Sequence, residues 1–175
     1  MEDNTPYLLG FDLAQRREFL SKYIGEKKPN SPILAASTYE DLARALVRNK
    51  GNCILVMDVN FGSPQMNTPD IYLEIFRSSI IQDAIHANKS RVLGVSENER
   101  ALELALKANT PVLNMSAFPQ LLAFFFHMTP ELYRSFLTKK QFNFTKIPSE
   151  VIAGEKSISG YDLSDTTKVL YSRDK

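Results

Sequence analysis

The stretch CILVMD, residues 53–58, decides how this sequence folds. Its first five residues, Cys53 to Met57, are apolar without interruption. An unbroken apolar run of this length is typical of a central strand in a parallel sheet, because helices cover both faces of such a strand. Asp58 follows at the carboxyl end of the run, which is the edge of a parallel sheet where ligands bind.

Short apolar runs recur on both sides of this stretch and alternate with segments of helical spacing. Four further strands are predicted, at residues 7–11, 32–36, 91–95 and 111–115. Parallel neighbours need crossover connections of a dozen or more residues, and the intervening segments have that length. The sequence therefore predicts an α/β domain with a doubly wound five-stranded parallel sheet.

Helix boundaries are predicted from the residues that cap helices. The predicted N-terminal caps are Asp12, Ser37 in a capping box with Glu40, Asp70, and Ser96 in a capping box with Glu99. A single helix is expected from Asp70 to about Lys89. Pro119 is suited to the first turn of the last helix of the domain.

The pattern changes after Thr129. Residues 131–140 favour a short helix, and the remaining residues offer short strand-like pieces separated by turn formers. We therefore predict an α/β domain over residues 1–129 and a C-terminal extension over residues 130–175. The extension is either a small β appendage or the start of a further domain.

Composition excludes several classes of protein. The chain has 175 residues, with 43% hydrophobic residues and 21 basic against 20 acidic residues, which is typical of a soluble globular domain without affinity for nucleic acid. Its apolar runs are far shorter than the roughly 20 residues of a membrane-spanning helix, and the N-terminus lacks the pattern of a secretory signal. One cysteine, Cys53, permits no internal disulfide. We expect a cytoplasmic protein with no membrane contact.

Polar side chains follow several of the predicted strands. Asp12 follows the first strand, Asp58 the third and Ser96 the fourth, while Asn114 or Met115 ends the fifth. The carboxyl ends of parallel strands meet at one edge of the sheet, so two carboxylates and a hydroxyl are expected to converge there. Without a basic group among them, this crevice is not expected to hold a phosphate ligand unless Mg2+ is bound.

These residues and their order resemble the receiver domain of bacterial two-component response regulators, over about residues 6 to 128. The resemblance rests on LLGFDLAQRREFL, CILVMDVN, VLGVSENERALELALKA and PVLNMSAFPQLL. It implies a flavodoxin-like receiver fold and a role in signal transduction or a phosphorelay. Enzymatic activity would then be limited to the domain's own phosphorylation and dephosphorylation.

The resemblance also implies a role for each polar residue. Asp58 corresponds to the aspartate that accepts a phosphoryl group, and Ser96 to the switch hydroxyl that bonds this group. Asp12, Asp58 and the carbonyl of Asn60 correspond to the ligands of Mg2+, whose hard charge suits oxygen donors. The implied partner is another protein or a second copy, bound through the region of the last helix.

The sequence departs from the family at three places. Phe11 replaces the first of two acids, Asn114 or Met115 replaces a lysine, and an unusually long loop, NFGSPQMNTPD, follows the acceptor strand. Losing a carboxylate weakens Mg2+ binding, and losing the ammonium removes a partner of the phosphoryl group. A degenerate or pseudo-receiver, which acts through protein contacts without control by phosphate, fits these departures.

Other interpretations of the same residues remain open. Asp58, Asp12 and Ser96 are also explained as caps of loops or helices. The apolar run 121–126 is either covered by the following segment, which we favour, or forms a partner surface. The alternative function is a small-molecule or nucleotide-binding α/β module that uses the same crevice.

Overall fold

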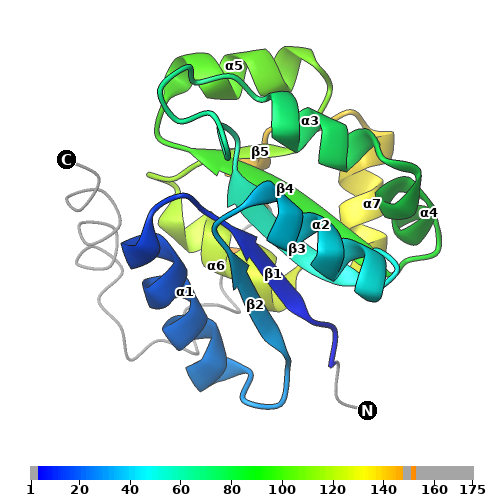
Figure 1. Cartoon of the computed structure of the whole chain (residues 1–175). Coiled ribbons are helices and arrows are strands. Elements are labelled where there is room, and N and C mark those ends of the chain that lie inside the picture. Colours follow the sequence, from blue (N-terminus) through cyan, green and yellow to red (C-terminus); the bar gives the residue numbers. More distant parts are fainter. Residues whose placement is uncertain (1–3, 148–150, 153–175) are drawn as a thin grey trace.

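The computed structural model describes residues 4–147 and 151–152 (Figure 1). Five strands form one all-parallel sheet in the order β2-β1-β3-β4-β5, a flavodoxin-like arrangement that confirms the predicted fold class. The strands are β1 (Tyr7–Gly10), β2 (Ile33–Ala36), β3 (Cys53–Asp58), β4 (Ser90–Ser96) and β5 (Val112–Asn114).

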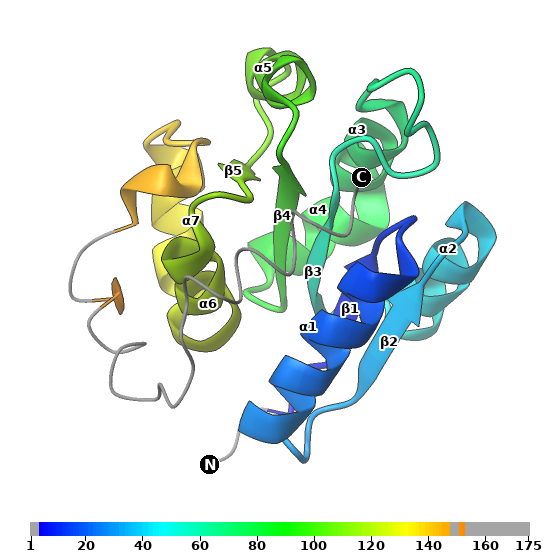
Figure 2. The same ribbon diagram turned by 90° about the vertical axis from the view of Figure 1, so that its left-hand side faces the viewer.

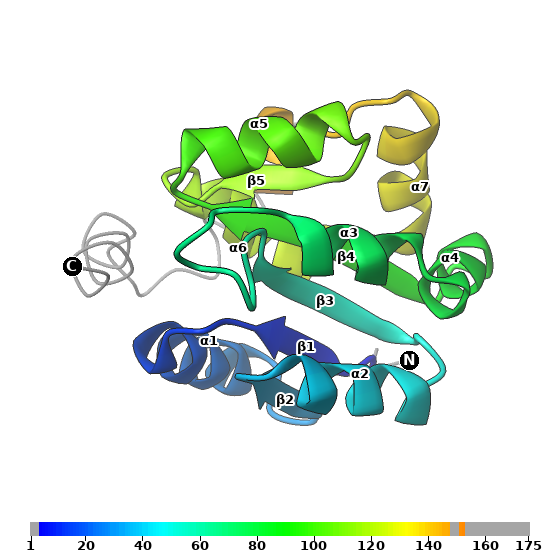
Figure 3. The same cartoon turned by 45° about the horizontal axis from the view of Figure 1, so that its top comes forward.

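Helices cover both faces of this sheet. They are α1 (Ala14–Lys27), α2 (Tyr39–Arg48), α3 (Asp70–Arg77), α4 (Ser79–His86), α5 (Glu99–Lys107), α6 (Phe118–His127) and α7 (Pro130–Thr138), followed by the 3-10 turn η1 (Phe144–Lys146). α1 and α6 share one face, where Phe19 packs on Phe118 and Tyr23 on Phe126 (Figure 2). In Figure 3, α2, α3 and α5 lie in front of the strands and α6 lies behind them.

The central strands are buried along their whole length. Every residue of β3 and of β4 is buried, as the unbroken apolar run 53–57 predicts. Gly94 in β4 allows a close approach of α3, because a Cβ there would lie 2.7 Å from the ring of Tyr72. Asp58 and Ser96 end these two neighbouring strands, so the core itself fixes the positions of both side chains.

All four predicted N-terminal helix caps are wrong by one or two residues. Leu13, not Asp12, precedes α1 and makes no side-chain cap. Thr38, not Ser37, caps α2 by accepting the N–H of Asp41 at 3.2 Å. Asp12 bonds the N–H of Gly62 instead of the helix. At α2, the neighbouring hydroxyls of Ser37 and Thr38 are both able to cap, and the position at which the preceding strand ends decides between them.

Asn98, not Ser96, caps α5 by accepting the N–H of Ala101 at 3.0 Å. The Asp70 cap is also wrong, because Asp70 is the first residue of α3 and Pro69 precedes it without a side-chain bond. Both errors place the helix start one to two residues from the sequence prediction.

The single helix predicted from Asp70 to about Lys89 is two helices. Ser78 ends α3 and begins α4 in an extended conformation, with its hydroxyl accepting the N–H of Ile81 at 3.4 Å. The same hydroxyl donates to the carbonyl of Ile75 at 2.6 Å. One serine therefore serves the last turn of one helix and the first turn of the next.

Residues after Pro130 complete the core of the same fold. The predicted helix after residue 130 is α7, and it supplies Tyr133 and Phe136. Together with Phe124 of α6 and Phe144 of η1 they form what we call the aromatic cluster, with ring centroids 4.9–6.0 Å apart. The run 121–126 is therefore largely covered by the chain itself, which confirms the favoured interpretation. The strand-like pieces predicted beyond residue 147 lie outside the described residues, as does the question of a further domain.

The two edges of the sheet differ. At the β5 edge, the N–H of Val112 donates to the carbonyl of Phe142 at 2.8 Å, and Val112 forms a parallel bridge with Asn143. At the opposite edge, no strand within the described residues pairs with the outer side of β2. The segment that carries η1 thus closes one edge of the sheet.

Candidate functional site

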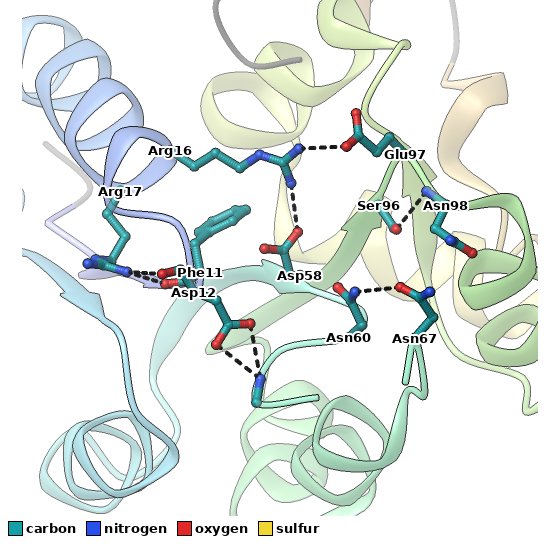
Figure 4. A network of polar contacts seen from close by, with 11 residues as sticks. Phe11, Asp12, Arg16, Arg17, Asp58, Asn60, Asn67, Ser96, Glu97 and Asn98 are labelled. Carbon is teal, nitrogen blue, oxygen red and sulfur yellow. Dashed lines mark hydrogen bonds and ion pairs between the residues drawn. The ribbon is translucent and has the colours of Figure 1, made fainter. Parts of the chain in front are cut away.

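The polar residues predicted to converge do lie together at the carboxyl ends of the strands (Figure 4). They line one cavity of about 430 Å3. Its lining residues are Asp12, Leu13, Arg16, Asp58, Asn60, Pro64, Asn67, Ser96, Glu97 and Asn98. The strand order places the ends of β1, β3 and β4 side by side, and each residue reaches the cavity from one of these ends or from the segment that follows it.

The floor of the cavity is a buried ion pair. Asp58 at the end of β3 is 5% exposed, and Arg16 in the first turn of α1 is 4% exposed. Nη1 of Arg16 donates to Oδ1 of Asp58 at 3.0 Å. Nη2 of the same guanidinium lies 3.5 Å from Oε1 of Glu97, which is exposed at the start of the β4–α5 connection. We call Asp12, Asp58, Glu97 and Arg16 the acid centre.

Burial dominates the chemistry of Asp58. It raises the pKa of this carboxyl to about 7, because the charged form loses its hydration. Arg16 opposes this shift, whereas the negative charges of Asp12 and Glu97 add to it. Asp58 is thus a carboxyl whose proton affinity lies near neutrality, which is common at functional sites.

Asp12 is held at the rim of the cavity rather than as a helix cap. Its two carboxylate oxygens accept the backbone N–H of Gly62 at 3.3 and 3.2 Å. Arg17 fixes the turn that carries it, donating to the carbonyls of Phe11 at 2.5 Å and of Asp12 at 3.0 Å. Asp12 therefore ties the β1–α1 turn to the long loop after β3.

Asn60 and Ser96 are engaged with the loops around them. Nδ2 of Asn60 donates to Oδ1 of Asn67 at 3.0 Å, which braces the long loop. Oγ of Ser96 accepts the N–H of Asn98 at 2.9 Å, so this hydroxyl supports the start of α5 without being its cap. Both side chains still border the cavity.

The arrangement does not fit a divalent cation. A guanidinium lies on Oδ1 of Asp58, and the oxygens of Asp12 accept hydrogen bonds from Gly62. Among the described residues, no three His, Cys, Asp or Glu side chains are grouped so that they could hold a metal ion. Mg2+ would need Arg16 to leave Asp58, so binding of the metal stays a prediction.

The positive charge in this crevice comes from α1 and not from the end of β5. At the end of β5, Asn114 accepts the N–H of Ser116 at 2.9 Å through Oδ1, and Met115 is buried. Arg16 of α1 supplies the positive charge instead. The expectation of a crevice without a basic group is therefore wrong, because the side chain of Arg16 reaches from α1 to the end of β3.

Sequence reasoning missed Arg16 and Glu97 as site residues. One signal pointed to Arg16: the first turn of α1 contains no acid but carries Arg16 and Arg17. Positive charge is unfavourable at a helix N-terminus, where the helix dipole attracts anions. An arginine in such a place needs a nearby acid, and Asp58 is that acid. Nothing in the sequence singles out Glu97, because its place depends on the length of the β4–α5 connection.

The chain matches no protein-family model, no curated protein and no solved structure. Among the helices of the described residues, none combines the length and the apolar character needed to cross a membrane.

Proposed function

We propose that this protein is a receiver-like signalling domain that acts through contacts with other proteins, with Asp58 as its candidate phosphoacceptor. One observation carries the proposal. Asp58 ends β3, Ser96 ends the adjacent β4, Asp12 follows β1, and all three line a single cavity at the carboxyl edge of a sheet of order 2-1-3-4-5. A cytoplasmic location and a role in a two-component phosphorelay belong to the same proposal.

The chemistry expected of Asp58 is transfer of a phosphoryl group from a small acyl phosphate. A carboxylate oxygen of Asp58 attacks phosphorus, the bond from phosphorus to the acyl oxygen breaks, and the carboxylate of the donor leaves. The pKa of about 7 leaves a substantial fraction of Asp58 ionised at neutral pH. Ser96 borders the same cavity, which supports its role as the hydroxyl that bonds the new phosphoryl oxygens in this proposal.

The test is intact-mass spectrometry after incubation with acetyl phosphate, with and without Mg2+. The proposal expects a gain of one phosphoryl group that is lost in Asp58→Asn. Asp70→Asn is the matched control, because Asp70 is an exposed carboxylate in the first turn of α3 and should leave the gain unchanged. No gain under either condition contradicts phosphorylation and leaves a pseudo-receiver, which signals by protein contacts alone.

The contact face in this proposal lies beside α5 and β5. Ser96 precedes Asn98, the cap of α5, so a change at Ser96 acts directly on the start of this helix. A groove of about 310 Å3 runs between α5, β5 and the segment after α7, with Leu102, Leu106 and Val112 among its lining. The apolar side chains of α6 lie mostly inside the core, so a partner near the last helix would contact this groove.

A second candidate is a module that binds a small polar molecule in the cavity of the acid centre. The observation that favours it is the size of the cavity, about 430 Å3, with a guanidinium, carboxylates and carboxamides in one lining. Ligand pockets commonly span roughly 300–1,000 Å3. Binding would appear as a rise in melting temperature with a nucleotide or sugar phosphate, absent in Arg16→Ala. That result without phosphorylation of Asp58 would favour this candidate.

A further inference from the structure

The guanidinium of Arg16 lies between Asp58 and Glu97, where a cation bound to these acids would otherwise lie. It lies 3.0 Å from Oδ1 of Asp58 and 3.5 Å from Oε1 of Glu97, and Asp12 lies close enough to Asp58 to raise the pKa of that carboxyl. Two carboxylates from separate segments therefore contact this guanidinium, and a third, Asp12, lies near Asp58. A guanidinium carries its donors in a planar fork and suits two acids at once, unlike an ammonium.

The surroundings show why the acid centre needs this charge. Asp58 is buried, and an ionised carboxylate without a counter-charge in such a place is costly. Within the part of the chain that the structure describes, the end of β5 brings Asn114 and Met115 to this edge of the sheet, neither of which carries a charge. Arg17, the other basic residue of the first turn of α1, is directed to the carbonyls of Phe11 and Asp12.

We infer that Arg16 is the resident cation of the acid centre: it takes the position of the divalent metal, and it joins Asp58 to the β4–α5 connection through Glu97. The inference rests on the proposed function and deepens it, since it names the residue that sets the state of this site. Two consequences follow. The protein does not take up Mg2+ while Arg16 is in place, and the start of α5 is held without metal or phosphoryl group.

The first consequence is tested by melting temperature and amide NMR shifts in the presence and absence of millimolar Mg2+. The wild type should show no Mg2+-dependent change, whereas Arg16→Ala should gain one, because removing the guanidinium frees Oδ1 of Asp58, and Mg2+ in proteins is held by one or two carboxylates together with water. Arg16→Ala combined with Asp58→Asn should lose the gain. Arg44→Ala is the matched control, since Arg44 is an exposed arginine of α2 paired with Asp41.

The second consequence is tested by hydrogen exchange of the amides of residues 96–98. Exchange should be about tenfold faster in Arg16→Ala than in the wild type, because the link from α1 to Glu97 is gone. Arg16→Lys covers the case in which the alanine variant does not fold. Its ammonium can pair with one acid but not bridge two, so Mg2+ should stay excluded while exchange still rises.

Two results would overturn the inference. One is a wild type that responds to Mg2+ as strongly as Arg16→Ala, and the other is unchanged exchange at residues 96–98 in both Arg16 variants. Neither readout depends on phosphorylation. A protein that fails to accept a phosphoryl group but behaves as expected here would count against phosphorylation while supporting the role of Arg16.

Discussion

The aromatic cluster and the Arg16–Asp58 pair of the acid centre are both buried, but the first consists of apolar rings and the second of charged groups. In the aromatic cluster, Phe124, Tyr133, Phe136 and Phe144 meet ring to ring, and the hydroxyl of Tyr133 donates to the carbonyl of Val92 at 2.6 Å. In the acid centre, one guanidinium lies between the carboxylates of Asp58 and Glu97, and Asp12 lies near Asp58.

The two regions differ in what they contribute to stability. Buried aromatic rings remove much apolar surface from water and add a favourable pairing geometry. A buried ion pair must first overcome the loss of hydration of two charges, and apolar residues in its place are often as stable or more so. The aromatic cluster thus contributes to stability, whereas the buried ion pair of the acid centre contributes little net stability.

The largest effect should come from Phe124→Ala, which removes the ring that contacts both Tyr133 and Phe144. We expect a loss of about 3–5 kcal/mol in the free energy of unfolding, measured by urea denaturation. Val47→Ala is the control on an exposed site of α2, where 68% of the residue is accessible, and should change stability little. A loss under about 1 kcal/mol for Phe124→Ala would remove the contrast between the two regions.

Arg16→Met should come next. It leaves Asp58 buried without its counter-charge, and breaking a buried pair from one side costs about 3–5 kcal/mol. Asp58 can take up a proton instead, so we expect the loss to be larger at about pH 8 than at about pH 5.5. Arg44→Met, in an exposed pair, should cost no more than about 1 kcal/mol at either pH. Equal losses of stability in the two arginine variants would show that the buried ion pair of Arg16 contributes no more than the exposed pair of Arg44.

Asp58→Asn should change the pH dependence of stability. The pKa of Asp58 is raised to about 7 in the folded protein, above its value of about 4 in an unfolded chain, so between these values the folded state binds more protons. The stability that this group contributes is thus present below about pH 4 and is lost as the pH rises through 7. The wild type should melt at a higher temperature near pH 5.5 than near pH 8.

In Asp58→Asn, much of this slope between about pH 5.5 and 8 should vanish, and the exposed carboxylate variant Asp70→Asn should retain it. Thermal unfolding followed by circular dichroism at a series of pH values measures both. An unchanged slope in Asp58→Asn would mean that another group titrates in this range.

The smallest effect is expected for Ser96→Ala. It removes the oxygen that accepts the N–H of Asn98, a hydrogen bond worth about 1 kcal/mol. Ser37→Ala is the control, because Ser37 is exposed and Thr38 caps α2 in its place. A loss of unfolding free energy as large as that of Phe124→Ala would show that the start of α5 contributes as much to stability as the aromatic cluster.

Much of the fold could be predicted from the sequence, because the apolar runs are periodic and local. The run 53–57 alone indicates a central parallel strand, and the spacing of later runs indicates the rest of the sheet. The break at Ser78 could not be predicted, since the apolar spacing continues through it and only the path of the chain requires a turn there. The predicted N-terminal caps differ from the observed ones by one or two positions, because the path of the chain after each strand also decides where a helix begins.

The candidate site could be predicted in part. Asp12, Asp58 and Ser96 follow strands, and the order of parallel strands brings them to one cavity. The hydrogen-bond partners of these side chains come from segments far apart in the sequence. Asp12 accepts the N–H of Gly62, and Arg16 of α1 donates to Asp58. Such pairings leave no periodic pattern in the sequence. The only sign of Arg16 is its position in the first turn of a helix, where a positive charge is unfavourable.

The closure of the β5 edge by residues 142–144 has a consequence for how the protein is made. During synthesis the strands emerge in the order β1 to β5, yet the edge of β5 stays uncovered until residues 142–143 have left the ribosome, and Phe124 lacks part of its packing until Phe144 follows. An open strand edge beside exposed rings is a site of aggregation. The nascent chain therefore passes through a vulnerable interval after β5 is complete, and any partner that shields α6 and β5 during translation would shorten it.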